Sequence, residues 1–514
     1  MKTYNDYKVY YGDIHTHCGI SYGHGSLEDA LKNAREQLDF CSVTGHAHWH
    51  DMPEPDERIQ YIIDFHKKGF QKLKNGWNDM LETLKKYNKD GRFLVFPGFE
   101  IHSNSDGDRT VVYKDITGEI IYAENIAQLH EKLKQLKEKG IESLSFPHHI
   151  GYKTGTRGIN WSTFDGNKEP VAELISMHGC SEKSENTRPF LHSMGPADWE
   201  STIQYGLKQG HIFGFCANTD HHSAHPGSYG HGRTALWAED LSRDALWQAF
   251  YQRRTYALTG DRIDLKFALN AAPMGSIIPA CKQRDIDISV SAGSAIDYVD
   301  IVKDNRLLKR FSQCDFDNTA DQDCETVKTK IHLELGWGER GKTTDWEVEL
   351  EIDEGEILDI EPRFRGREVV SPVEKKDNSS QFYTSTWQRL SEKSLKLSCT
   401  SESNPNNSTC TTQGICLEIQ APRSARIKAV LNGKREVISL QRLMEGAYTG
   451  SLGSIDSPAY KFNRAPRSNE MNWNIKYIDT GTDTRFDIGH SFYYIRVKQQ
   501  NDQWAWSSPV FVKK

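Results

Sequence analysis

Histidine and carboxylate side chains recur in short clusters along the first 260 residues, and clusters of this kind could bind metal ions. The first cluster is His15-Thr16-His17, which follows the apolar run Val9-Tyr10-Tyr11. On an extended backbone, residues two apart project from the same face, so both imidazoles can reach one ion. A single His-x-His pair is weak support in a chain with 20 histidines, and a solvated strand edge is the alternative. The recurrence of similar clusters favours a metal site.

The candidate metal ligands share one chemistry, because all of them offer nitrogen or carboxylate oxygen and none offers sulfur. This donor set suits Zn²⁺, Mn²⁺ or Fe²⁺ better than a structural thiolate site. Glu100 is the expected bridge between ions, since a carboxylate can join two ions and a neutral imidazole cannot. Taken alone, His24 would be assigned to a surface loop and His178 to the core; the whole set makes them candidates. The candidates are His15, His17, His24, His46, Glu100, His148, His178, Asp220 and His222.

Most of these candidates stand just after a short apolar run of the kind that forms strands. Helical patterns separate several of the runs, and strands that alternate with helices predict a parallel sheet, because parallel neighbours need long crossovers. Ligands at the carboxyl ends of such strands predict a barrel whose rim gathers them. An open doubly wound sheet is the alternative, although it would not readily bring together residues from every strand end. The apolar runs are 40–44, 93–96, 144–146, 171–177 and 212–216.

The expected helices have recognisable ends. Ser26 is a good N-cap, with Asp29 at the third helical position, for a helix that ends near Leu38. A helix around residues 126–136 is expected to end at Gly140. Another is expected at about 197–209, before the run 212–216.

Beyond about Asp261 apolar and polar residues alternate, which is typical of antiparallel strands. Residues 346–352 alternate in this way, and Asn432-Gly433 between two alternating runs is a strong hairpin signal. We therefore predict an α/β metal-binding catalytic barrel in residues 1–260. Residues 261–514 are predicted to form a β-rich, sandwich-like C-terminal domain with loop insertions.

The composition argues against nucleic acids and membranes as binding partners. The 64 basic and 71 acidic residues give a net charge of −7, with no basic block, so nucleic acid is not an expected partner. No apolar run approaches the roughly 18 residues of a membrane span, and the polar start Met1–Lys8 does not resemble a signal core. We expect a soluble chain with no membrane partner. It would be cytoplasmic, or periplasmic or secreted if an export signal was removed, and its oligomeric state stays open.

The 10 cysteines do not decide the compartment. Three of them fall in or beside expected core strands, where a free buried thiol is the default interpretation. Five others bracket or lie near polar loops and are disulfide candidates, which would indicate an oxidising compartment. The first set is Cys18, Cys41 and Cys216, and the second is Cys314, Cys324, Cys399, Cys410 and Cys416.

As an ordered set, these motifs resemble those of the PHP (polymerase and histidinol phosphatase) superfamily over about residues 7–260. The combination with the segment 253–260 and a β-rich tail ending at 506–509 is similar to an uncharacterised bacterial branch of PHP-like proteins. The resemblance implies a distorted (β/α)7 barrel with a di- or trinuclear metal centre used for phosphoester hydrolysis. The motifs are His15-Thr16-His17, Thr44-Gly45-His46, Gly98-Phe99-Glu100, Pro147-His148, His178 and Thr219-Asp220-His221-His222.

Carried onto the matching positions, the resemblance implies three groups of ligands. One ion would be held by His15, His17, Glu100 and Asp220. A second would be held by Glu100, His148 and His178, and a third by His24, His46 and His222.

The sequence departs from the family pattern at two places. Gly45 stands where the family usually has Asp before His46, so the role of that carboxylate is absent or is taken by His48 or His50. His24 lies one residue farther from His17 than the pattern of the third ion would suggest.

The leading interpretation is a metal-dependent hydrolase, a phosphoesterase that uses metal-activated hydroxide on a small phosphorylated substrate. Glu100 and Asp220 would be central to catalysis, and His149, beside a ligand, could support that ligand or act as a general acid. The same position suits a packed histidine, because neighbours on a strand point to opposite faces. His221 is in the same situation.

Phosphoryl oxygens need a positive partner, and a guanidinium can hold two of them. Arg233, after the last metal motif, is the preferred candidate over Arg157, Lys183 and Arg188, although each could instead form a surface ion pair. Two other functions stay open. The chain could be a non-catalytic metal-bearing binding or accessory protein, or a hydrolase of a non-phosphate ester or amide.

Overall fold

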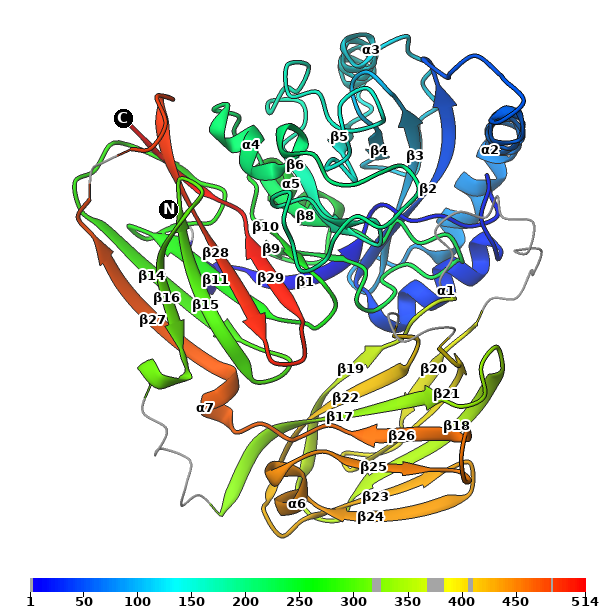
Figure 1. Ribbon diagram of the computed structural model, residues 1–514, viewed down its shortest axis with the longest axis vertical. Helices are drawn as coiled ribbons and strands as arrows, with labels where there is room; N and C mark the ends of the chain where they lie inside the picture. Colours follow the sequence, from blue (N-terminus) through cyan, green and yellow to red (C-terminus); the bar gives the residue numbers. More distant parts are fainter. Residues whose placement is uncertain (1–2, 317–324, 368–382, 405–409, 482–483) are drawn as a thin grey trace.

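The structure is a computed structural model, and it describes residues 3–316, 325–367, 383–404, 410–481 and 484–514. The N-terminal region is mixed α/β, and the C-terminal half consists mainly of antiparallel β-strands (Figure 1). At this level the prediction of an α/β region followed by a β-rich region is confirmed. Among the described residues, none of the helices is long and apolar enough to cross a membrane.

The first three strands are parallel, as predicted, with helices as crossovers between them. Ser26 caps α1 through a reciprocal pair of hydrogen bonds with Asp29. The helix expected at 197–209 is shorter, because Thr202 has an extended backbone and caps a new start at Ile203. The elements are β1 (Lys8–Asp13), α1 (Leu27–Gln37), β2 (Phe40–Trp49), α2 (Gln60–Tyr87), β3 (Leu94–His102), β4 (Arg109–Tyr113), α3 (Ile126–Glu138), β5 (Ser143–Pro147), β6 (Val171–Ser176), β7 (Gly179–Cys180), α4 (Ile203–Lys208), β8 (Gly214–Ala217), β9 (Arg233–Ala238), α5 (Arg243–Tyr251) and β10 (Thr255–Leu258).

Two strands of this region were not predicted, and both are antiparallel to their neighbours. Strand β4 lies between β3 and β5, and β9 lies between β1 and β10. Every residue of β4 and β9 is buried, so neither strand shows the alternation that identifies a half-exposed strand. The region is therefore not a simple alternation of parallel strands and helices.

The strand pairing does not close into a barrel in the described part of the chain. Strands β6, β7 and β8 form a separate sheet, although β6 lies beside β5, and β8 lies beside β9 and β10. The hydroxyl of Thr234 on β9 accepts a hydrogen bond from the Ala217 N–H at 3.1 Å and donates to the Ala217 carbonyl at 2.6 Å. The Thr234 side chain thus replaces a backbone partner for Ala217 of β8. The two sheets enclose one interior although no continuous ladder of backbone hydrogen bonds joins them.

The end of the chain returns to the N-terminal sheet. Strand β10 pairs with β29, so that the N- and C-terminal strands share one 13-stranded sheet. One apolar cluster contains Tyr11, Tyr256, Phe267, Ile288 and Val497 and is continuous across residue 260. The division of the chain at that residue stays a prediction. The elements are β11 (Asp264–Leu269), β12 (Ala272–Pro273), β13 (Ile277–Ile278), β14 (Arg284–Ser291), β15 (Ile296–Lys303), β16 (Arg306–Ser312), α7 (Ser468–Met471), β27 (Asn472–Asp479), β28 (His490–Gln499), β29 (Trp504–Ser507) and β30 (Val510–Lys513).

Strands β17 to β26 form a separate pair of antiparallel sheets, which we call the inserted sandwich (Figure 1, lower part). The predicted alternation holds, since Trp346, Val348 and Leu350 all point into its apolar cluster. Asn432 and Gly433 join β23 to β24 with positive φ values of 48° and 85°. The elements are β17 (Thr326–Trp337), β18 (Thr343–Ile352), β19 (Glu356–Arg363), β20 (Thr386–Arg389), β21 (Ser394–Glu402), β22 (Gln413–Pro422), β23 (Arg426–Leu431), β24 (Lys434–Ser439), α6 (Leu440–Glu445), β25 (Tyr448–Ser451) and β26 (Pro458–Phe462).

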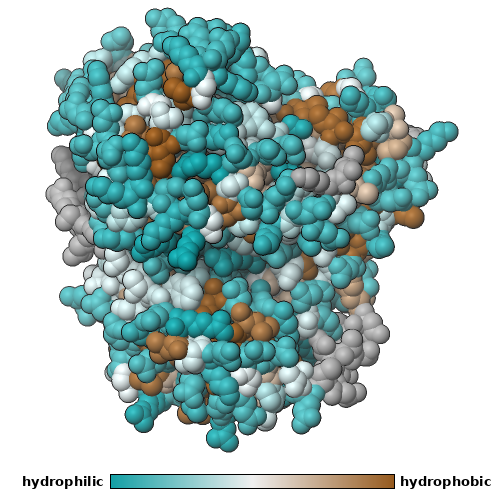
Figure 2. Space-filling view, turned by 180° about the vertical axis from the view of Figure 1, so that it is seen from behind, coloured by the Kyte–Doolittle hydropathy of each residue, from teal (hydrophilic) through white to brown (hydrophobic). Residues whose placement is uncertain are grey.

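The inserted sandwich contacts the α/β region through its strands β19 and β20, which lie against α1. The Tyr229 N–H donates to the Phe364 carbonyl at 2.9 Å, and the Gly366 N–H donates to Ser228 Oγ at 3.1 Å. On the face seen in Figure 2, hydrophobic residues are scattered in separate patches over a mainly hydrophilic surface.

The described cysteines are all free thiols. Cys399 and Cys416 are buried, while Cys314 and Cys410 are exposed. Cys324, another disulfide candidate, lies outside the described residues. The structure therefore pairs none of Cys399, Cys410 and Cys416, which were disulfide candidates.

Candidate metal centre

Four side chains from three distant parts of the chain meet at the ends of β1 and β3. His17 Nε2 lies 2.9 Å from Asp220 Oδ1 and 3.2 Å from Glu100 Oε2. His15 Nε2 lies 3.4 Å from the same Glu100 oxygen. All four side chains are buried, and their donor atoms lie within 4.8 Å of one another. The structure thus brings together the first predicted group of ligands.

Asp13, the last residue of β1, joins the two loops that carry these ligands. Its carboxylate accepts hydrogen bonds from the N–H groups of His15 at 3.1 Å, Thr219 at 3.3 Å and Gly227 at 2.8 Å. Burial raises the pKa of Asp13 to about 6, although the hydrogen bonds from the Thr219 hydroxyl and from these N–H groups oppose the rise. The position of Asp220 relative to His15 is therefore fixed by backbone contacts.

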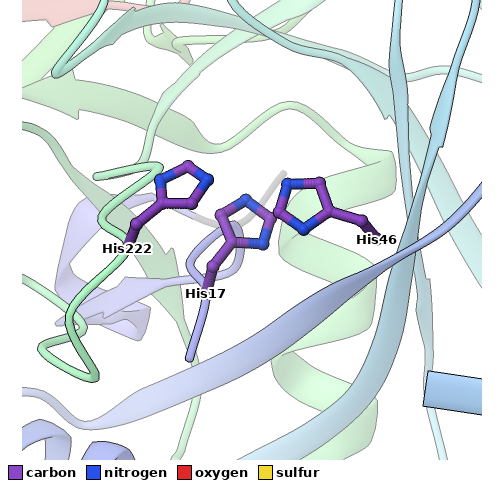
Figure 3. Close-up of side chains that lie close together, drawn as sticks. All are labelled: His17, His46 and His222. Carbon is purple, nitrogen blue, oxygen red and sulfur yellow. The ribbon is translucent and has the colours of Figure 1, made fainter. Parts of the chain in front are cut away.

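A second group consists of three histidines that point toward one another, with His17 between His46 and His222 (Figure 3). The rings of His17 and His46 are stacked with centroids 4.0 Å apart, and those of His17 and His222 are 4.4 Å apart. His17 takes the place that was predicted for His24. The His24 N–H donates to the His222 carbonyl at 2.8 Å, but its ring belongs to none of the donor groups in the described residues.

The third group lies on the other side of Glu100. His148 Nε2 is 3.2 Å from Glu100 Oε1, and these two residues share a donor group with Asp108 and His149. His178 was predicted beside Glu100 and His148. Its Nε2 instead lies 2.9 Å from Asp220 Oδ2. His102 forms a fourth group with His46 and Glu100, and its Nδ1 is 2.9 Å from Glu100 Oε1.

Most of the histidines in these groups have their outer ring nitrogen fixed by a neighbour. Glu173 Oε2 lies 3.0 Å from His15 Nδ1, and Thr110 Oγ1 lies 2.9 Å from His148 Nδ1. Similar contacts join Tyr152 to His178 at 2.6 Å, Ser21 to His46 at 3.1 Å and the Asp220 carbonyl to His222 at 2.8 Å. Metal-binding histidines are usually held in this way, because the outer contact orients the ring and fixes its tautomer.

The charge of the centre also suits cations. Burial alone would raise the pKa of Glu100, but His46, His148 and His102 hold it well below its usual range. Burial would likewise lower the pKa of His15, yet Asp220 and Glu173 raise it well above its usual range. Glu100 is therefore ionised and draws positive charge toward the ligand positions.

The outer histidines respond in the opposite way. Burial, and then the neighbouring His17, hold the pKa values of His46 and His222 well below their usual range. A neutral imidazole has a free lone pair, which is the form that binds a metal. His17 Nδ1 and His148 Nε2 are buried without a hydrogen-bond partner among the described residues. Buried nitrogen and carboxylate donors with unmet bonding capacity fit divalent ions.

Gly45, where the family usually has Asp, packs closely against Leu73. A Cβ atom there would lie 2.7 Å from Leu73 Cδ1, so a larger side chain would require the Leu73 side chain to move. His48 and His50 do not replace the carboxylate, since neither belongs to a donor group in the described residues. The extra donor beside His46 is His102.

Three residues around Glu100 were missed in the sequence. His102 had a signal, because Glu100 and His102 are two apart on β3, a spacing that lets two side chains share one face. Glu173 lies inside the apolar run of β6, and Asp108 stands in a loop, where no spacing rule applies. Arg157 was considered in the sequence, but Arg233 was preferred to it. Arg157 Nε donates to Asp108 Oδ2 at 2.7 Å, and its Nη2 lies 3.5 Å from Glu100 Oε1.

Arg233, the preferred phosphate partner, is the first residue of β9 and is fully buried. Its guanidinium donates to the Gly227 carbonyl at 2.8 and 3.0 Å and to Gln37 Oε1 at 2.8 Å. These contacts brace the loop after Asp220 against α1. His221, also considered in the sequence, is buried, and its ring belongs to none of the described donor groups.

Comparisons with known proteins give limited likenesses. A family described as a protein of unknown function, DUF3604, matches residues 221–271. Proteins described as uncharacterised from Chlamydia trachomatis and Chlamydia muridarum are each 28% identical to this chain over 251 residues, which is 45% of the chain. The chain spans about 40% of the length of these curated relatives.

One solved structure is also similar to this chain. It is described as a two-domain protein from Bacteroides vulgatus that contains a predicted PHP-like metal-dependent phosphoesterase. It is 12% identical, covers 85% of this chain and 97% of its own, and has a TM-score of 0.32. The donor groups described above stand on their own geometry.

Proposed function

We propose that this protein is a metal-dependent hydrolase, a PHP-like phosphoesterase that acts on a small phosphorylated substrate. The observation that carries the proposal is the overlap of the donor groups. Glu100 Oε2 faces His15, His17 and His46, whereas Glu100 Oε1 faces His148 and His102. A single carboxylate with its two oxygens in different groups is what neighbouring ions need as a bridge.

Paired divalent ions, when bound, would lower the pKa of a water and stabilise the attacking and leaving oxygens of a displacement at phosphorus. Three of the donor groups have Glu100 in common, so the ions would be neighbours. The order of the motifs, which resembles that of the PHP superfamily, supports phosphorus as the reacting centre. Zn²⁺, Mn²⁺ and Fe²⁺ all suit the nitrogen and oxygen donors.

We assign the recognition of phosphoryl oxygens to Arg157 and no longer to Arg233. The guanidinium of Arg157 reaches the centre, and its side chain is 16% exposed, so a ligand at the centre can meet it. Its Nη1 contacts only Met194 Sδ at 3.6 Å among the hydrogen-bonding atoms of the described residues, which leaves donor capacity for an anion. Arg233 has no contact of this kind with the donor groups.

His149 keeps its proposed role as a proton donor or supporting residue. Its Nε2 lies 3.3 Å from Asp108 Oδ2, and its Nδ1 has no hydrogen-bond partner among the described residues. A histidine oriented by a carboxylate on one nitrogen can exchange a proton at the other.

The test is hydrolysis of p-nitrophenyl phosphate and bis-p-nitrophenyl phosphate by the purified protein with Mn²⁺ or Zn²⁺. We expect turnover that is lost in His17→Ala and kept in His211→Asn, whose ring stacks on Trp161 outside the centre. Bound metal without turnover on a broad panel of phosphate mono- and diesters would contradict the phosphoesterase and favour an accessory protein.

A further inference from the structure

Arg157 lies at a corner of the centre where two buried carboxylates converge. Its Nε donates to Asp108 Oδ2 at 2.7 Å, and its Nη2 contacts the same oxygen and lies 3.5 Å from Glu100 Oε1. His102 Nδ1 at 2.8 Å and His149 Nε2 at 3.3 Å reach the same Asp108 oxygen. A single guanidinium therefore occupies the point at which these donors meet.

The same corner has the composition of a metal site. Glu100, Asp108, His148 and His149 present donor atoms within 4.8 Å of one another, and all four are buried. His148 Nε2 is fully buried and has no hydrogen-bond partner among the described residues. A divalent ion and a guanidinium would thus compete for one set of donors.

The charge balance shows why a cation is needed there. The centre buries four carboxylates, those of Glu100, Asp108, Glu173 and Asp220. Within the described residues, Arg157 is the one Arg or Lys side chain that pairs with any of them. Buried carboxylates without compensating positive charge are strongly unfavourable.

The backbone holds Arg157 in this position. Arg157 has a φ of 67°, a conformation that non-glycine residues adopt rarely and mostly where the surroundings impose it. The neighbouring Gly158 is required, because a Cβ there would lie 1.6 Å from the Tyr152 carbonyl oxygen. The Gly155 N–H donates to the Asn104 carbonyl at 3.0 Å, which ties this loop to the loop that carries Asp108.

We propose that Arg157 is the resident cation of the Asp108 corner and excludes a divalent ion from Asp108 and His149. The metal ions then bind to the other donors around Glu100, and Asp108 and His149 pair with the arginine. Arg157 also keeps an exposed edge, so that one side chain neutralises the corner and faces the substrate position. This inference concerns metal occupancy and holds whichever ester the protein hydrolyses.

The test is the number of Mn²⁺ ions per chain, counted by elemental analysis after equilibrium dialysis at a fixed free Mn²⁺ concentration. We expect Arg157→Met to bind one ion more than the wild type, or to bind the corner ion at least about tenfold more tightly. Arg157→Lys keeps the positive charge and should match the wild type. Adding Asp108→Asn to Arg157→Met should abolish the gain.

An unchanged count and affinity in folded Arg157→Met, or a gain that survives the loss of Asp108, would overturn the proposal. Circular dichroism establishes that the variants are folded. A second measurement needs no variant: anomalous diffraction from wild-type crystals grown with Mn²⁺. We expect no Mn²⁺ peak within coordinating distance of both Asp108 and His149, and a peak there would overturn the proposal. Absence of phosphatase activity would refute the proposed function but leave this metal count unaffected.

Discussion

The α/β region and the inserted sandwich bury side chains of opposite chemistry. The interior of the first gathers histidines and ionised carboxylates around Glu100, whereas the sandwich packs Trp346, Leu350 and Leu417 into an apolar cluster. Apolar burial is favourable in itself, but buried charge is stable only when it is paired. The comparison therefore predicts that bound cations stabilise the α/β region and not the inserted sandwich.

The largest expected effect is the loss of a shared ligand. Asp220→Ala removes the carboxylate that faces His15, His17 and His178, and activity and metal affinity should both fall by more than about 100-fold, beyond the loss of an outer partner. The measurements are turnover of p-nitrophenyl phosphate and Mn²⁺ content. Glu349→Gln, on an exposed position of the sandwich, is the matched control.

If Asp220→Ala kept its metal content and its activity, the first donor group would not be a metal site.

A substitution in the core of the inserted sandwich should lower stability without changing metal binding. Leu417→Ala leaves a cavity in a fully packed apolar cluster, and the free energy of unfolding should fall by about 2–5 kcal/mol. The Mn²⁺ content of the folded protein should not change. Urea unfolding measures the free energy of unfolding, and elemental analysis of the folded protein measures its Mn²⁺ content. A loss of metal in the folded variant would show that the two regions are coupled.

A smaller effect is expected from a residue that orients a ligand. Glu173→Gln removes the negative charge beside His15 Nδ1, and Mn²⁺ affinity should fall by about 10- to 100-fold while the fold is kept. Glu418→Gln, a carboxylate of the sandwich paired with Lys328, is the control. Equal Mn²⁺ affinities in Glu173→Gln and Glu418→Gln would show that Glu173 does not support metal binding.

The smallest effect concerns the contact between the two regions. Burial would raise the pKa of Glu361, but Arg363, Arg262 and Lys330 lower it from 4.5 to about 2. Because the folded pKa is the lower one, this carboxylate stabilises the fold above about pH 4.5, and the contribution is lost as the pH falls toward 2. Glu361→Gln should therefore reduce the fall in Tm between pH 6 and pH 3 by at least about 2 °C.

Thermal melts of both proteins across this pH range check the sign of the effect. An equal acid-induced fall in Tm in Glu361→Gln would mean that Glu361 does not contribute to the pH dependence.

The sequence predicts the parts of the centre that follow from strand geometry. His15 and His17 lie two apart after a strand, and the motif that contains Asp220 follows another apolar run, so their meeting with Glu100 could be anticipated. These side chains do lie together, and their role as ligands stays a prediction. Local sequence patterns also predicted the alternating strands of the sandwich and the hairpin at Asn432.

The rest depends on contacts that no local pattern encodes. Strands β4 and β9 are wholly buried and so lack alternation, which hid two antiparallel members of the sheet. Asp108 and Arg157 meet because two loops pack closely: a Cβ at Gly107 would lie 2.7 Å from Ile159 Cα. Arg233 was favoured for its place after a metal motif, but sequence distance does not show which way a side chain points.

The most direct test is a count of divalent ions per chain in the wild type and in His17→Ala, after equilibration with Mn²⁺ or Zn²⁺ and removal of free metal. Because Glu100 is shared by several donor groups, the account predicts at least two ions in the wild type, and it predicts fewer in the variant because His17 belongs to two of the groups. A folded wild-type chain that binds no ion under these conditions would contradict it.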